Sequence, residues 1–198
     1  MEQLVEIREF SSGDLHAASR ITEHIWGEEC GTLPPDLSRM IYEYLVRYYY
    51  VPDSSLSLAA ADGENTLRAF LLAAAGEFSH KAADEWAARN CPAEGRGFFN
   101  AYRAYLDGNG DAVRRMLKEK EVRLLLFGSL QKGAGSLLLN ELVRRCRGRG
   151  VSSLLLWTDD TCDFAWYDRR GFSLAAEFDA IPSLPGRKLR TLVFRKEL

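Results

Sequence analysis

The residues with the clearest chemical potential form the run Leu-Gln-Lys-Gly-Ala-Gly-Ser at positions 130–136. Residues 121–127 before this run are rich in apolar side chains without a helical period, which is typical of a buried strand. After it, apolar residues such as Leu138 and Leu142 recur at helical spacing. A glycine-containing turn that opens a helix presents unpaired backbone N–H groups at the positive end of the helix dipole. The pattern therefore predicts an anion site, and a phosphate or pyrophosphate suits such a site best.

Other kinds of reactive site find little support in the sequence. The cysteines and histidines are scattered along the chain, without a CxxC pair or a metal-like spacing. They are Cys30, Cys91, Cys146, Cys162, His16, His24 and His80. No metal site and no catalytic triad is therefore expected. The run GxxxxGK[ST] and the full GxGxxG pattern are both absent, which disfavours a P-loop nucleotidase and a dinucleotide site.

The chain of 198 residues has a formal net charge of -2 and fits a single domain over residues 1–198. A balance this close to neutral gives no reason to expect nucleic acid as a partner. No run is long and apolar enough for a membrane span, and scattered cysteines without a signal-like N-terminus suggest a cytoplasmic protein. One basic cluster stands at 144–149. It is either a solvated helix end or part of a polyanion site, and a CoA 3′-phosphate could use part of it.

Periodicity and turn residues predict the elements that must position the turn. The expected strands are 4–10, 55–61, 66–75, 121–127, 151–158, 173–178 and 188–198. Helices are expected at about 14–26 and 36–48, then from 133 to 147, with a short helical region at 159–170. The order strand, helix, strand from 121 to 158 implies a parallel pair of strands joined by a crossover.

Residues 76–120 change pattern and lie between two expected strands, so they predict a helical insertion. Three helices are expected there, at about 78–89, 98–106 and 111–120, with residues 107–110 as a break. The insertion carries the aromatic residues Phe78, Trp86, Phe98, Phe99, Tyr102 and Tyr105. These side chains either pack the insertion onto the sheet or form a wall of a substrate site.

Three features in this order resemble the GNAT acyltransferase (N-acetyltransferase) superfamily. They are the strand–turn–helix unit, the strand at 151–158, and Tyr167 followed four and five residues later by Gly171 and Phe172. The phosphate-loop pattern of the family is Gln/Arg-x-x-Gly-x-Gly/Ala, and Gly133-Ala134-Gly135 matches its second half. Its first position is Leu130 here, where the family has Arg or Gln. An Asn that the family often has seven residues before the tyrosine is replaced by Asp160.

The resemblance implies an α/β fold with a mixed, mostly antiparallel sheet, helices on both faces and a helical insertion before the central strand. It also implies acetyl-CoA as acyl donor, with no metal. The residues implied to hold the donor are Leu125, Leu126 and Phe127 on the central strand, Leu130, Gln131, Lys132, Gly133, Ala134, Gly135 and Ser136 in the turn, and Asp160. A backbone N–H from 125–127 would polarise the thioester carbonyl, and Tyr167 would protonate the leaving thiolate. Alternatively, Tyr167 packs beside its aromatic neighbours.

The function that follows is N-acyl transfer, most simply of an acetyl group, to a small-molecule or peptide amine, by a monomer or homodimer. The alternatives are a non-catalytic acyl-CoA-binding module and a scaffold that contacts other proteins through the insertion. No residue stands out as the base. Glu121 and Asp159 lie at strand ends and Glu77 begins the insertion, and each is expected to be a solvated surface acid.

Overall fold

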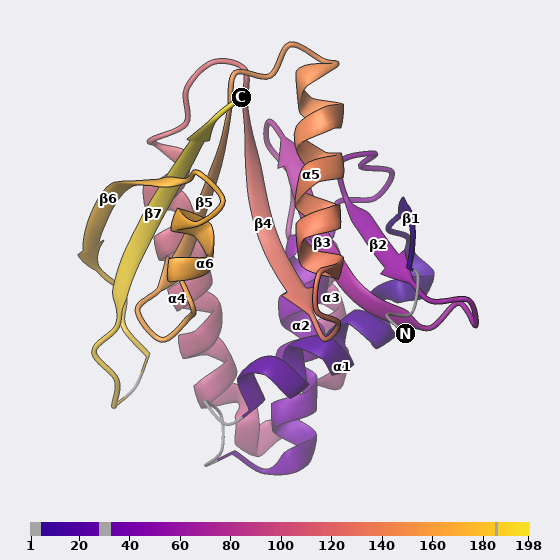
Figure 1. The fold of residues 1–198 in the computed structure, drawn as a ribbon. Helices are drawn as coiled ribbons and strands as arrows, with labels where there is room; N and C mark the ends of the chain where they lie inside the picture. The colour runs from indigo at the N-terminus through magenta and orange to yellow at the C-terminus, as the bar shows by residue number, and fades with distance from the viewer. Residues whose placement is uncertain (1–4, 28–32, 185) are drawn as a thin grey trace.

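A seven-stranded sheet organises the chain, with strand order β1-β2-β3-β4-β5-β7-β6 (Figure 1). The computed structural model describes residues 5–27, 33–184 and 186–198. The strands are β1 (Glu6–Glu9), β2 (Leu58–Ala61), β3 (Leu67–Ala75), β4 (Glu121–Ser129), β5 (Ser153–Asp159), β6 (Ser173–Asp179) and β7 (Arg190–Glu197). The start of the first expected strand, residue 4, and Cys30 lie outside the described residues.

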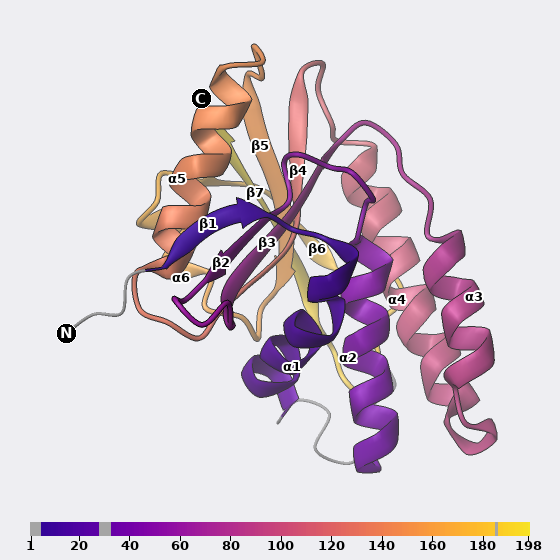
Figure 2. The ribbon, with the colours of Figure 1, turned by 90° about the vertical axis from the view of Figure 1, so that its right-hand side faces the viewer.

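The helices cover both faces of the sheet (Figure 2). They are α1 (Leu15–Trp26), α2 (Pro35–Tyr49), α3 (Lys81–Asn90), α4 (Arg96–Arg114), α5 (Ala134–Arg147) and α6 (Ala165–Asp168). One buried cluster joins α1, α2, α3 and α4 to side chains such as Phe70 and Leu72 of β3. A second cluster joins α5 to Leu71 and Ala73 on the opposite face of the same strand. Successive side chains of β3 therefore point alternately to the helices on one face of the sheet and to α5 on the other.

β4 and β5 form the parallel pair that the expected crossover requires, and the other neighbouring strands pair antiparallel. The mixed, mostly antiparallel sheet with helices on both faces is thus confirmed. The β4–β5 register covers three positions and ends at Arg123 opposite Leu155. Beyond this point the two strands diverge toward the N-terminal end of α5 (Figure 1).

The diverging strands β4 and β5 form a fork, and an ion pair stabilises the end of the fork where the two strands are still paired. Glu121, at the start of β4, bonds the Arg195 Nε of β7 at 2.6 Å through its Oε1 atom. The same oxygen accepts the Ser153 hydroxyl of β5 at 2.8 Å. Three strands are therefore tied together just before β4 and β5 separate.

The insertion is helical as expected, but the break predicted at 107–110 was wrong. Gly108 and Asn109 lie inside one continuous helix, α4. A Cβ atom at Gly108 would stand 1.8 Å from the Ile181 carbonyl oxygen, so glycine here permits close approach of another segment. The buried Asn109 amide accepts the Ile181 N–H and the Thr191 hydroxyl. Tertiary contacts of α4 thus offset the low helix propensity of these residues. The helix expected at 111–120 ends at Arg114.

Among the helices of the described residues, none combines the length and apolar character needed to cross a bilayer.

Candidate functional site

A cavity of about 660 Å³ occupies the fork between β4 and β5. On one side its lining comes from α1, α2 and α4, which belong to the first buried cluster. On the other side it comes from the turn at 130–136, the segment around α6, and Phe127 of β4. Because the lining includes side chains from both faces of the sheet, the cavity passes through the sheet where the strands have separated.

A β-bulge at Leu125 reshapes the wall of the cavity. Leu72 of β3 pairs with Leu126 and Ala73 pairs with Leu124, so Leu125 is the extra residue. Leu125 and Leu126 consequently pack against the same cluster, whereas Leu124 and Phe127 face the other. From Leu124 onward the β5-facing edge of β4 has no strand partner. Leu125, Leu126 and Phe127, the predicted carbonyl-binding residues, all line the cavity.

The turn at 130–136 opens α5 against the same cavity. Gly133 precedes the helix with a φ of 87°, in the left-handed region that glycine tolerates. The backbone N–H groups of Gly135 and Ser136 have no acceptor among the described residues. A Cβ atom at Gly135 would lie 2.8 Å from the Phe127 ring, so a side chain at this position would collide with the cavity wall beside the turn at 130–136. These features fit a pyrophosphate at the positive end of the helix dipole.

Most of the predicted donor-binding residues reach the cavity. Leu130, Gln131, Lys132, Gly133, Gly135 and Ser136 line it. Ala134, the first residue of α5, does not line the cavity and is buried in the core between α5 and the sheet. Asp160 lies outside the lining, and its carboxylate accepts the Arg190 backbone N–H at 3.1 Å. Their roles toward a donor stay predictions.

Arg170 is a cavity residue that the sequence did not single out. Its Nη2 atom donates to the Ser136 hydroxyl at 2.6 Å, and its guanidinium lies 4.8 Å from the centre of the Trp166 ring. The cation therefore stands beside the free helix N-terminus, whereas Leu130 is 47% exposed and offers no charge. Its position between Tyr167 and Gly171 was the available signal, but sequence spacing alone could not place it next to Ser136.

Tyr167 lines the cavity from α6. Its ring is 5.6 Å from Phe172 and 5.3 Å from Trp166, both in edge-to-face geometry. Its hydroxyl forms no hydrogen bond with the described residues. Burial, with the nearby Cys162 and Asp163, raises the pKa of this phenol above its ordinary value. The hydroxyl therefore stays protonated through the neutral pH range, while the ring also serves the packing role.

The three acids considered as bases have different surroundings. Asp159 lines the cavity at the end of β5, half-buried. Glu121 is 7% exposed, so its expected solvation was wrong; Arg195 and other hydrogen bonds outweigh burial and lower its pKa. Glu77 is exposed and pairs with Arg114 at 3.0 Å, as expected of a surface acid. Of the three, Asp159 lies in a position to act on a substrate in this cavity.

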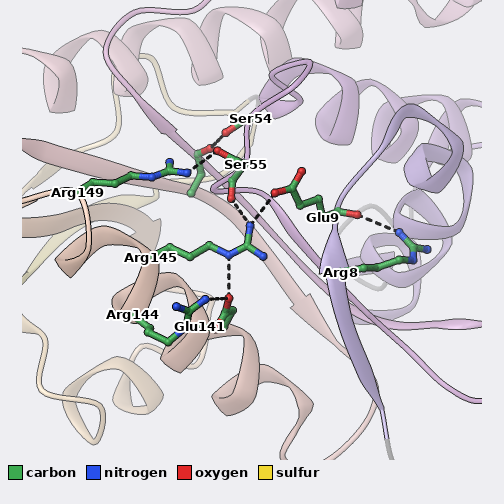
Figure 3. Close-up of polar contacts among 9 residues, drawn as sticks. Arg8, Glu9, Ser54, Ser55, Glu141, Arg144, Arg145 and Arg149 are labelled. Carbon is green, nitrogen blue, oxygen red and sulfur yellow. Dashed lines mark hydrogen bonds and ion pairs between the residues drawn. The ribbon is translucent and has the colours of Figure 1, made fainter.

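Three arginines of the basic cluster at 144–149, namely Arg144, Arg145 and Arg149, make structural contacts at the other end of α5 (Figure 3). Arg145 bonds Glu9, the Ser55 carbonyl oxygen and Glu141. Hydrogen bonds from Arg144 and Arg145 lower the pKa of Glu141 to about 2. A helix of this length spans about 21 Å, so the cluster is remote from the turn. The contacts favour the helix-end interpretation over a polyanion site.

No group of three or more His, Cys, Asp and Glu side chains that could hold a metal ion occurs in the described part of the chain.

Comparison with known proteins identifies the fold. No family model and no curated protein sequence matches the chain. The ribosomal-protein-S18-alanine N-acetyltransferase from Escherichia coli aligns with a TM-score of 0.57 and 14% identity, over 98% of this chain and 94% of that chain. The polyamine N-acetyltransferase of Drosophila melanogaster aligns with a TM-score of 0.59 and 17% identity, over 98% and 100%.

A third structure, the paia N-acetyltransferase from Thermoplasma acidophilum in complex with coenzyme A, gives a TM-score of 0.53 and 15% identity, over 98% and 99%. The chain therefore has the GNAT fold, as its motifs predicted.

Proposed function

We propose that this chain is an acyl-CoA-dependent N-acyltransferase that moves an acetyl group from acetyl-CoA to a primary amine. The observation that carries the proposal is the cavity through the β4–β5 fork. It places a free helix N-terminus and a protonated phenol beside one face of the sheet, and a carboxylate beside the other. Two substrates could enter such a cavity from opposite faces and meet between the strands.

The donor would lie against the turn and α6. Its pyrophosphate would accept hydrogen bonds from the Gly135 and Ser136 N–H groups, with Arg170 as a nearby cation. Arg170 would supply the positive charge that Leu130 lacks. The thioester end would then point along the unpaired edge of β4 toward the bulge at Leu125. There a backbone N–H that lacks a ladder partner can stabilise negative charge on the carbonyl oxygen.

The reaction joins the amine nitrogen to the thioester carbonyl carbon and breaks the carbon–sulfur bond. The nitrogen loses one proton as the amide forms, and the departing CoA sulfur gains one, so the products are an N-acetyl amine and free CoA. Tyr167, as a protonated phenol on the donor side, would hydrogen-bond to the sulfur and assist its protonation.

The test measures binding and turnover separately. Acetyl-CoA should raise the melting temperature, because a ligand that binds the native state stabilises it by mass action. A thiol-detecting assay with a panel of amines should then show amine-dependent release of CoA. No thermal shift and no release with any amine would refute the proposal. A thermal shift without release would select the alternative, a non-catalytic acyl-CoA-binding module, to which the departures at Leu130 and Asp160 give some weight.

A further inference from the structure

We infer that Asp159 binds the ammonium group of the acceptor, and that the acceptor is a monoamine with a compact apolar or aromatic body. This inference rests on the proposed function, since it concerns the acceptor half of the same cavity. It combines three observations: where Asp159 points, which groups contact its carboxylate, and what covers the walls around it.

Asp159 faces the side of the sheet opposite α5. In β5, Leu154 and Leu156 pack in the cluster beneath α5, whereas Trp157 packs in the cluster with α2 and α4. Because side chains alternate along a strand, Asp159 lies on the same face as Trp157. The hydroxyl of Tyr105, from α4, confirms this by donating to Asp159 Oδ2 at 3.0 Å. The carboxylate thus faces the side of the cavity opposite the phosphate turn.

The carboxylate of Asp159 has no positively charged partner within the described residues. Its protein donors are the Tyr105 hydroxyl, the backbone N–H and hydroxyl of Thr161, and the Cys162 thiol at 3.7 Å. All of these groups are neutral donors. A half-buried carboxylate whose protein donors are all neutral has no counter-charge among the described residues, and an ammonium ion complements it in both charge and hydrogen bonding.

Aromatic side chains contribute much of the cavity lining on the Asp159 side. They are Trp26, Tyr42, Tyr49, Tyr102, Tyr105 and Trp157. Several polar tips of these side chains are used within the protein. The Tyr42 hydroxyl bonds the Trp26 carbonyl oxygen, and Tyr49 hydrogen-bonds Trp157. These side chains consequently contribute mainly their rings to the lining, and aromatic rings suit an apolar body and also attract a cation.

The charges in the cavity argue against an acceptor with several amines. Besides Asp159, the described residues contribute one further carboxylate to the lining, Asp163, which is exposed and lies 3.8 Å from Arg169. The lining on the Asp159 side also includes apolar side chains such as Leu45, Leu106 and Leu189. Within the described residues, a second ammonium group there would therefore meet a mostly apolar wall, where an unpaired charge costs free energy.

Asp159 also has a chemical use once the amine is bound. The ammonium form carries no lone pair for attack, so it must first lose a proton. The carboxylate that contacts the ammonium can take that proton, leaving a neutral amine to attack the thioester carbon. The proton then passes to solvent, and the proton that the nitrogen loses on forming the amide balances the one gained by sulfur.

The first experiment uses the unmodified protein without acetyl-CoA and measures amine binding by calorimetry. Phenethylamine should bind at least tenfold more tightly than 2-phenylethanol, because only the amine can pair with Asp159. Hexylamine should bind at least tenfold more tightly than 1,6-diaminohexane, because the described part of the cavity offers the second ammonium no carboxylate partner. Equal affinities within either pair would overturn the inference.

The second experiment compares Asp159→Asn with Asp163→Asn, a matched change at the exposed carboxylate of the same cavity. Asp159→Asn should weaken phenethylamine binding about 10- to 100-fold, the usual worth of hydrogen bonds to a charged group. Asp163→Asn should change it less than twofold. Unchanged binding in Asp159→Asn would refute the assignment. Asp159-dependent amine binding in a protein that neither binds nor turns over acetyl-CoA would defeat the proposed function and leave only the amine-binding role of Asp159 in place.

Discussion

The hydroxyl of Tyr167 offers the sharpest test of the proposed chemistry, through the substitution Tyr167→Phe. Phenylalanine keeps the ring, so the edge-to-face contacts with Trp166 and Phe172 remain. The hydroxyl has no hydrogen-bond partner among the described residues, so its removal leaves no protein group unpaired. The free energy of unfolding should therefore change by no more than about 1 kcal/mol. For a chain of this size that corresponds to about 2–4 °C in Tm.

Turnover should respond very differently from stability. A positioned proton donor contributes about 10²–10⁴-fold to a reaction, so kcat should fall by a factor near the lower part of that range. The assay is steady-state release of CoA thiol at saturating amine, with kcat/KM measured alongside. Both constants should fall together, because the hydrogen bond to sulfur forms only as the carbon–sulfur bond breaks. Acetyl-CoA affinity should stay nearly unchanged.

The pH dependence provides an independent check on Tyr167. Burial raises the pKa of the phenol, so its proton is retained up to and beyond pH 10. The unmodified enzyme should consequently show no loss of kcat from this group between pH 7 and about 9.5. A well-folded Tyr167→Phe protein with full activity would refute the catalytic assignment and leave Tyr167 as a packing residue.

Three further predictions test the donor site and the fork. Gly135→Val should abolish the thermal shift caused by acetyl-CoA, since its side chain meets the Phe127 ring; Gly63→Val, whose Cβ meets nothing within 4 Å, should retain it. Arg170→Ala should weaken acetyl-CoA binding about tenfold in calorimetry, as expected for one charge-assisted contact. The control variant Arg169→Ala, which removes an exposed neighbouring arginine, should change this affinity little. Equal effects of the two substitutions would contradict the role of Arg170. Glu121→Gln should cost about 3–5 kcal/mol in urea unfolding, because it leaves Arg195, whose side chain is only 16% exposed, without its counter-charge. The folded pKa of Glu121 lies below its ordinary value of 4.5; its stabilisation is therefore complete above that pH and lost as the pH falls. An unmodified protein whose acid unfolding matches that of the variant would contradict this reasoning.

Features set by neighbouring residues could be predicted from the sequence. The apolar run before residue 128, the glycine turn and the helical spacing of α5 are local patterns, and all three occur as expected. The spacing from Tyr167 to Phe172 likewise reflects one turn, closed by the Phe172 N–H bond to the Tyr167 carbonyl oxygen. These patterns predicted the parallel crossover directly, and they carried the family resemblance that implied the rest of the mixed, mostly antiparallel fold.

The tertiary structure alone decided how the site is assembled. Tyr105 reaches Asp159 across 54 positions and Arg170 reaches Ser136 across 34. Neither contact has a sequence period that could reveal it. The fork between β4 and β5 and the bulge at Leu125 depend on strand pairing, which apolar runs do not specify. The continuity of α4 through Gly108 likewise depends on the Ile181 carbonyl that approaches it. Helix and strand propensities contribute little free energy per residue, so packing between distant segments overrides them wherever the two disagree.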